Sequence, residues 1–278
     1  MHQHLWPAAL VDVLRRRRRP PRLTGTVLEL KEGRFAFDAE AHDPDRRLAE
    51  LDRDGVDVAV VSLQPTLGSS FPTEVIDAYH EGIADVSERS QGRIRPLAAG
   101  PVPDGFAGLC LSAHDLYRLD EHEFLLDELE RAGRFLFVHP GPPSGAPAGA
   151  PDWWGPGIGY AVQMQAAYGI WLVRGVPRWP RLPVVFAILA GGAPFQLERL
   201  AGRGFDLRTA LEADVYLETA SYGRRALELS LATYGVGRIV YGSDAPVMDP
   251  RPMLRELRTF GEAVMSAVCE TNPERLLR

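Results

Sequence analysis

Short, almost continuously apolar runs alternate with amphipathic segments along most of this chain. The amphipathic segments repeat apolar residues every three or four positions, which predicts helices, and the apolar runs are rich in β-branched and aromatic residues, which predicts buried strands. Helices are predicted at 8–19, 45–54, 73–90, 121–132 and 163–174. Strands are predicted at the start of the chain, where it carries His2 and His4, and at 56–63, 94–99, 108–112, 135–139, 184–189, 215–219 and 238–242.

Eight strands alternating with helices predict an α/β fold with a parallel sheet, because helical connections cover both faces of such a sheet. The repeat closes most naturally into a TIM-like (β/α)8 barrel, and 278 residues suit a single barrel domain over 1–278. A doubly wound open sheet is the alternative fold, but no glycine-rich nucleotide fingerprint follows the first strand.

Two segments interrupt the alternation of strands and helices. Residues 24–38 alternate around Lys31-Glu32-Gly33 and predict a small β-hairpin inserted after strand one. Residues 140–159 are crowded with Pro, Gly and Ala, and this segment is longer than a minimal connection between a strand and a helix. Connections of this length in compact domains are often lids or binding loops, so a lid loop is predicted here, with disorder as the alternative.

The composition is that of an ordinary globular enzyme, with 45% hydrophobic and 24% charged residues. The formal charge of −6 argues against a general nucleic-acid binder. Five arginines at 15–19 are interpreted as a solvated helix end, with a phosphate-binding patch as the alternative. Two cysteines, Cys110 and Cys269, suggest no disulfide framework and fit a reducing cytoplasm. No apolar run reaches membrane-spanning length and no signal-peptide core is found at the start, so a cytoplasmic protein is predicted.

Histidine and aspartate side chains lie where predicted strands end. On a strand, residues i and i+2 point to the same face, so His2 and His4 present two imidazoles side by side. His139 ends the run at 135–139, and Asp244 follows the run at 238–242. The carboxyl ends of barrel strands meet at one face, where active sites are built. Three imidazoles and one carboxylate suit a divalent metal ion, zinc first and manganese or iron as alternatives. A chance pair of histidines and a core histidine at position 139 are the structural alternatives.

Several segments resemble the amidohydrolase superfamily, specifically its amidohydrolase 2 or aminocarboxymuconate-semialdehyde-decarboxylase-like branch. The matching segments are His2-Gln3-His4-Leu5-Trp6-Pro7, His42-Asp43 with 51–57, 138–141, 191–195, 241–246 and 272–277. They follow the order of the family over essentially the whole chain. The resemblance implies a metal-dependent barrel enzyme, a hydrolase, decarboxylase or hydratase of small carboxylated or lactone-like substrates. It also implies that the metal ligands are His2, His4, His139 and Asp244, and that a homodimer is a reasonable expectation.

Two features depart from the family pattern. The family has a histidine at the end of strand six that positions and deprotonates the metal-bound water, and Ile188 stands at that position here. An isoleucine side chain can neither accept a proton nor orient water. Members also have several apolar residues and an aspartate before the first histidine pair, whereas only Met1 precedes it here, so a truncated gene start is hypothesised.

Other residues at the predicted functional face are candidates for the chemistry. Asp244 is a candidate proton acceptor as well as a ligand, and His114, just beyond strand four, is a second catalytic candidate, with an exposed loop histidine as the alternative. Glu218 ends strand seven and is a candidate for the substrate pocket. Trp6 and Trp153 are candidate pocket walls, with ordinary core or lid packing as the alternative.

These observations lead to one function prediction and two alternatives. The first choice is metal-dependent hydrolysis of a small, carboxylated organic substrate through a metal-bound water. The alternative within the same branch is nonoxidative decarboxylation with the same ligands. A third hypothesis is a ligand-binding pseudoenzyme, favoured by Ile188 and opposed by the retained ligand set. The expected partner is a small-molecule substrate, and neither nucleic acid nor a membrane is expected.

Overall fold

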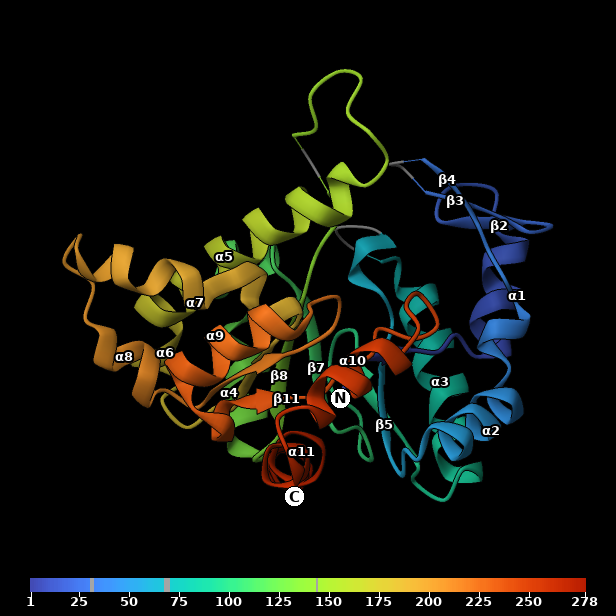
Figure 1. Ribbon diagram of the computed structural model, residues 1–278. Helices are drawn as coiled ribbons and strands as arrows, with labels where there is room; N and C mark the ends of the chain where they lie inside the picture. The colour runs from blue at the N-terminus through green and yellow to red at the C-terminus, as the bar shows by residue number, and fades with distance from the viewer. Residues whose placement is uncertain (31–32, 68–70, 144) are drawn as a thin grey trace.

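Eight short strands form one parallel sheet in the computed structural model, which describes residues 1–30, 33–67, 71–143 and 145–278 (Figure 1). Each strand pairs in parallel with the next one of the sheet along the chain. In sheet order they are β1 (Gln3–His4), β5 (Ala59–Ser62), β6 (Ile94–Ala98), β7 (Gly108–Ser112), β8 (Phe135–His139), β9 (Val184–Phe186), β10 (Val215–Glu218) and β11 (Ile239–Val240).

The segment after β11 returns to the first strand and closes the sheet. Gln3 forms a parallel bridge with Ala245, and the amide of His4 donates to the carbonyl of Ala245 over 2.7 Å. The amide of Asp244 donates in turn to the carbonyl of His2 over 2.9 Å. The predicted TIM-like barrel is therefore confirmed, and its closure brings residues from the two ends of the chain into contact.

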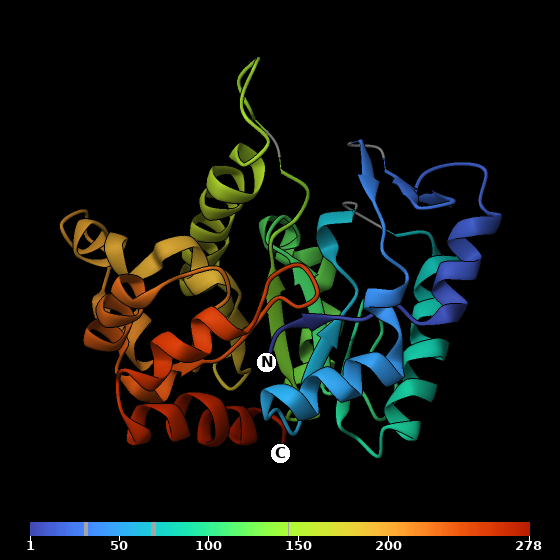
Figure 2. The ribbon, with the colours of Figure 1, turned by 45° about the vertical axis from the view of Figure 1, so that its right-hand side comes forward.

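Helices surround the sheet, so that most strands are buried on both faces (Figures 1 and 2). Every residue of β5, β7, β8, β9 and β10 is buried, as expected for continuous apolar runs in a parallel sheet. The helices are α1 (Ala8–Arg16), α2 (Pro44–Asp54), α3 (Thr73–Arg89), α4 (Glu123–Arg131), α5 (Tyr160–Ile170), α6 (Val176–Arg178), α7 (Ile188–Ala201), α8 (Leu207–Glu212), α9 (Arg224–Tyr234), α10 (Arg251–Arg258), α11 (Glu262–Ser266) and α12 (Asn272–Leu276). Within the described ranges, none of these helices is long and apolar enough to cross a membrane.

Helix α2 shows how local sequence sets element boundaries. The side chain of Asp43 accepts a hydrogen bond from the amide of Arg46 over 2.8 Å and caps the first turn. Pro44 occupies the first helical position, where its missing amide hydrogen costs nothing. The helix ends at Gly55, whose φ of 69° is the left-handed conformation that glycine adopts without a Cβ clash.

The insertion after β1 is a three-stranded antiparallel sheet, one strand more than the predicted hairpin. Its strands are β2 (Arg22–Thr24), β3 (Val27–Glu29) and β4 (Arg34–Ala36). The sequence did not indicate β2, because three residues that follow two prolines are too few to show the alternation of a strand. Strand β2 contacts α1, and the small sheet lies beside that helix (Figure 1). Residues 31 and 32 of the predicted turn lie outside the described residues.

One long helical segment follows the Pro- and Gly-rich stretch after β8. Two π-helical turns, η4 (Gly155–Gly159) and η5 (Trp171–Gly175), flank α5, and α6 follows directly. The helical segment is therefore longer at both ends than the predicted 163–174. The stretch before η4 projects above the rest of the chain (Figure 2).

Candidate metal centre

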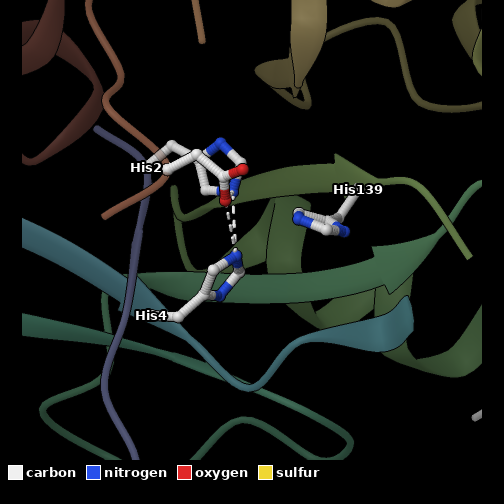
Figure 3. A group of neighbouring side chains, drawn as sticks. His2, His4 and His139 are labelled. Carbon is white, nitrogen blue, oxygen red and sulfur yellow. Dashed lines mark hydrogen bonds and ion pairs between the residues drawn. The ribbon is translucent and has the colours of Figure 1, made fainter. Parts of the chain in front are cut away.

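Four side chains from three parts of the chain meet at the mouth of the barrel. His2 and His4 come from β1 and the residue before it, His139 ends β8, and Asp244 lies in the loop after β11. One ligand-type atom from each of the four lies within 4.8 Å of the other three. The rings of His2, His4 and His139 gather around one point (Figure 3). The structure thus brings together the four residues that the sequence analysis named as ligands.

The Nδ1 atom of each histidine lies at hydrogen-bonding distance from an oxygen that can only accept. The pairs are His2 with Glu218 Oε2 (3.1 Å), His4 with the Ser62 carbonyl (3.1 Å) and His139 with the Pro140 carbonyl (2.8 Å). Each Nδ1 therefore carries the ring hydrogen and donates it, which leaves the lone pair on Nε2. Hydrogen bonds of this kind fix both the tautomer and the ring orientation of metal-binding histidines.

The unprotonated atoms of the cluster converge. The Nε2 atoms of His2 and His4 lie 3.2 Å apart, and Asp244 Oδ1 lies 3.0 Å from Nε2 of His4 and 3.4 Å from Nε2 of His2. Asp244 Oδ1 is buried and accepts no hydrogen bond from the residues that the structure describes. Lone pairs at such distances repel one another unless a cation lies between them. The donor set therefore fits a divalent metal ion, and the cluster can hold one.

The electrostatics of the cluster favour neutral rings at His4 and His139 and an ionised carboxylate at Asp244. Burial lowers the pKa of His4. Burial and then the neighbouring His2 and His4 hold the pKa of His139 well below its usual value. Burial would raise the pKa of Asp244, but the surrounding histidines outweigh it and lower that pKa to about 2. His2 differs, because the carboxylates of Glu218 and Asp244 raise its pKa against the effect of burial.

Asp244 reaches the cluster through an unusual backbone conformation. Its φ of 56° lies in the left-handed region, which aspartate tolerates better than most side chains. The amides of Ser243 and Asp244 both donate to the carbonyl of His2, which anchors this turn against the first strand. The Asp244 side chain keeps 17% of its surface exposed, so a substrate can reach it.

Strand β9 ends earlier than predicted. It stops at Phe186 rather than at 189, and the five residues from Ile188 to Gly192 all have positive φ. Three of these residues carry side chains that disfavour this conformation by roughly 1–2 kcal/mol each. The amide of Ile188 donates to Glu218 Oε2 over 3.2 Å, and its side chain is almost fully buried. Gln165 Nε2 on α5 donates to the carbonyl of Gly191 over 2.6 Å and holds the same turn.

Two other candidates lie next to the cluster without belonging to it. Glu218 is fully buried behind His2, so its carboxylate contacts a proposed ligand and not the open face of the site. His114 packs against the backbone of Gly141, two residues beyond His139, and a Cβ atom on Gly141 would lie 2.7 Å from His114 Nδ1.

The two tryptophans lie in different environments. Trp6 is buried and packs against the rings of His42 and Phe37, at centroid distances of 5.4 and 5.0 Å. Trp153 is 60% exposed on the projecting segment, beside Trp154. Trp6 is thus part of the buried packing beside the inserted sheet, whereas the ring of Trp153 is exposed to solvent.

Sequence reasoning missed three residues that shape the site. The carbonyl of Ser62 accepts from His4, and the one available signal was a polar residue ending an apolar strand. Gln163 on α5 accepts from the amide of Gly141 and donates to its carbonyl, over 2.8 and 3.1 Å. Burial and then the charge of Asp244 raise the pKa of Tyr160, the first residue of α5. Nothing local in the sequence distinguishes Gln163 or Tyr160 from other helical residues.

A family comparison agrees with this geometry. The amidohydrolase family model matches residues 1–278. The chain belongs to the amidohydrolase family. A curated relative, 2-amino-3-carboxymuconate-6-semialdehyde decarboxylase from Dictyostelium discoideum, is 24% identical in an alignment that covers 83% of this chain and 76% of that protein.

Solved structures of similar fold include other decarboxylases. The 5-carboxyvanillate decarboxylase of Sphingomonas paucimobilis matches this amidohydrolase with a TM-score of 0.72 and 19% identity, covering 100% of this chain and 98% of its own. A dihydroxybenzoic acid decarboxylase from Polaromonas sp. JS666, solved with bound manganese, matches with a TM-score of 0.71 and 16% identity, covering 99% and 95%.

These comparisons correct the predicted reaction. Hydrolysis is the first choice predicted from the sequence, and nonoxidative decarboxylation is the alternative. The curated relative and both of these solved structures are decarboxylases, so the first choice is wrong and the alternative is better supported. The recognition of the family and of an enzyme within it is confirmed.

Proposed function

We propose that this amidohydrolase is a metal-dependent, nonoxidative decarboxylase of a small carboxylated substrate with a conjugated skeleton. The observation that carries the proposal is the cluster of three imidazoles around Oδ1 of Asp244 at the barrel mouth, an atom that accepts no hydrogen bond within the described part of the chain. The activities of its relatives support the choice of reaction, since their named substrates are conjugated or aromatic carboxylates.

His2, His4 and His139 would hold the metal ion through Nε2, with Asp244 as the fourth ligand. When bound, such an ion supplies positive charge that binds the substrate carboxylate and withdraws electron density from it. Zinc suits three imidazoles and a carboxylate, and manganese is the second choice because a related decarboxylase binds it.

Decarboxylation requires a proton at the carbon that loses carbon dioxide. Asp244 is the carboxylate of the cluster; its side chain is partly exposed, and its pKa of about 2 keeps it ionised at neutral pH. It would take the proton of a substrate hydroxyl or amino group next to the carboxylate and deliver it to the carbon. The bond to the carboxylate then breaks, its electron pair returns to the conjugated system, and a solvent proton restores the hydroxyl or amino group. The products are carbon dioxide and the substrate skeleton with hydrogen in place of the carboxylate.

The test measures labelled carbon dioxide released by the zinc- or manganese-loaded protein. The panel holds hydroxybenzoates and amino- or hydroxy-substituted dienoates labelled with carbon-13 at the carboxylate. We expect release from at least one compound and loss of at least about 100-fold in rate for Asp244→Asn, in line with general acid–base catalysis. Asp249→Asn is the matched control, because Asp249 lies in the same loop, is exposed and pairs with Arg251. Metal content is measured for each variant, and metal-loaded wild type that releases no label from any compound contradicts the proposal.

A further inference from the structure

Glu218 occupies a position that neither the family comparison nor the ligand set explains. It ends β10 and is fully buried, yet its carboxylate lies at the meeting point of four chain segments. Oε2 accepts from His2 Nδ1 over 3.1 Å and from the amide of Ile188 over 3.2 Å. Oε1 accepts from the amide of Ala220 over 2.6 Å. Three donors satisfy this carboxylate, which is the arrangement expected for a buried charge with a positional role.

The chain also leaves room for this side chain. Gly242 follows β11, and a Cβ atom at that position would overlap Glu218 Oε1 far inside van der Waals contact. Any other residue at 242 would push the carboxylate away from His2. Glu218 thus sits in a space that the neighbouring strand keeps free.

Among the acceptors of the three ligand histidines, Glu218 differs in charge. His4 and His139 donate to the neutral main-chain carbonyls of Ser62 and Pro140, whereas His2 donates to a carboxylate. A carboxylate acceptor makes the imidazole a stronger electron-pair donor at Nε2 than a carbonyl does. Together, the buried charges of Glu218 and Asp244 balance the two positive charges of one divalent ion.

We propose that Glu218 is a positioning residue that sets the metal affinity of the site through His2 and ties that ligand to the turn beginning at Ile188. This inference rests on the proposed function only in assuming a metal at the cluster. From the sequence, Glu218 is a candidate for the substrate pocket. The proposed role is different, because a fully buried carboxylate acts on the metal ligand His2 and not on the substrate.

The experiment measures zinc affinity by chelator competition in wild type and in Glu218→Gln. With its oxygen toward His2 and Ile188, the amide places its NH2 group at the position of Oε1, so the variant keeps the shape and removes the charge together with the hydrogen bond from the amide of Ala220. We expect zinc to bind about 10–100-fold more weakly. Glu228→Gln is the matched control, because it makes the same chemical change at an exposed glutamate on α9 that pairs with Arg224, and its zinc affinity stays close to that of wild type.

A second measurement is made first on wild type, so its main result does not require that a variant folds. In zinc-loaded wild type with nitrogen-15 histidine, the Nδ1-bound proton of His2 resonates farther downfield than those of His4 and His139, because its acceptor is charged. This resonance moves upfield in Glu218→Gln, which a merely structural role would not cause. Equal zinc affinity in the two proteins, or three equivalent Nδ1 proton resonances in wild type, overturns the inference.

These readouts separate the inference from the proposed reaction. If Glu218→Gln weakens zinc binding but wild type releases no carbon dioxide, the positioning role stands and the decarboxylase proposal falls. If wild type releases carbon dioxide and Glu218→Gln binds zinc as tightly as wild type does, the reaction stands and the positioning role falls.

Discussion

The carboxylate of Glu218 fills the space that a side chain on Gly242 would need. Glu218 ends β10 and Gly242 follows the neighbouring strand β11, and the absent Cβ of Gly242 lets Glu218 reach His2. A glycine here is therefore a steric requirement of the site and not a need for backbone freedom.

Gly242→Ala should destabilise the fold by about 1–3 kcal/mol, the usual cost of overpacking a buried site. The expected readout is a lower midpoint of urea unfolding together with weaker zinc binding, because Glu218 must move. Gly202→Ala is the control, since Gly202 has a φ of −63° and the nearest atom to its added Cβ lies at 3.6 Å. Equal effects of the two substitutions would contradict the close packing described here.

The left-handed turn after β9 makes a second prediction about stability. Ala190 has a φ of 50° and Ala187 a φ of −60°, and both side chains are fully buried. Replacement by glycine removes one methyl group from each site, but it also relieves a conformational cost of roughly 1–2 kcal/mol at Ala190 alone. Ala187→Gly should therefore be more destabilising than Ala190→Gly by about that amount in urea unfolding. Equal losses would argue against the positive φ at Ala190.

Metal binding should stabilise the folded chain. With the Nε2 atoms of His2 and His4 3.2 Å apart, a cation relieves the repulsion of two lone pairs. One divalent ion per chain is expected by elemental analysis, and free metal at about 100 times its Kd adds about 2.7 kcal/mol of stability. His139→Ala should abolish the metal-dependent rise in Tm, whereas His114→Ala, outside the cluster, should keep it. If neither zinc nor a chelator changes the Tm of wild type, the metal site is refuted.

His42 should make stability depend on pH. Burial, followed by the nearby His4 and Arg47, lowers its pKa from 6.5 to about 3. Between about pH 3 and pH 6.5, the ring is neutral in the folded protein but protonated in the unfolded chain. The contribution of neutral His42 to the free energy of unfolding is therefore complete above about pH 6.5 and is lost as pH falls toward 3. The loss amounts to about 1.4 kcal/mol per pH unit within that window.

His42→Asn should reduce the slope of unfolding free energy against pH between pH 6 and pH 4. The amide oxygen of asparagine can replace Nδ1 as the acceptor of the Trp6 amide, which keeps the local hydrogen bond. An unchanged slope in this variant would show that other groups set the acid sensitivity.

The sequence predicted strands well where their pattern was local. The runs at 108–112 and 135–139 match β7 and β8 residue for residue, because continuous apolar runs bounded by polar or turn residues leave little ambiguity. The run at 184–189 extended too far, because Ile188 and Leu189 are apolar residues in a turn, which is stabilised by a hydrogen bond from the Ile188 amide to Glu218 and by one from Gln165 to Gly191. Apolar composition alone does not distinguish such a turn from a strand.

The sequence by itself determined the fold class and pointed to the four residues that meet at the barrel mouth, because strand ends of a parallel barrel share one face and residue type decides which of them could bind a metal. Tertiary structure decided the hydrogen bonds that orient them. The bond from His2 to Glu218 joins residues 216 positions apart, and the one from His4 to Ser62 spans 58. Neither hydrogen bond can be predicted from the local sequence pattern, because each forms only when the barrel closes and brings these strands into register.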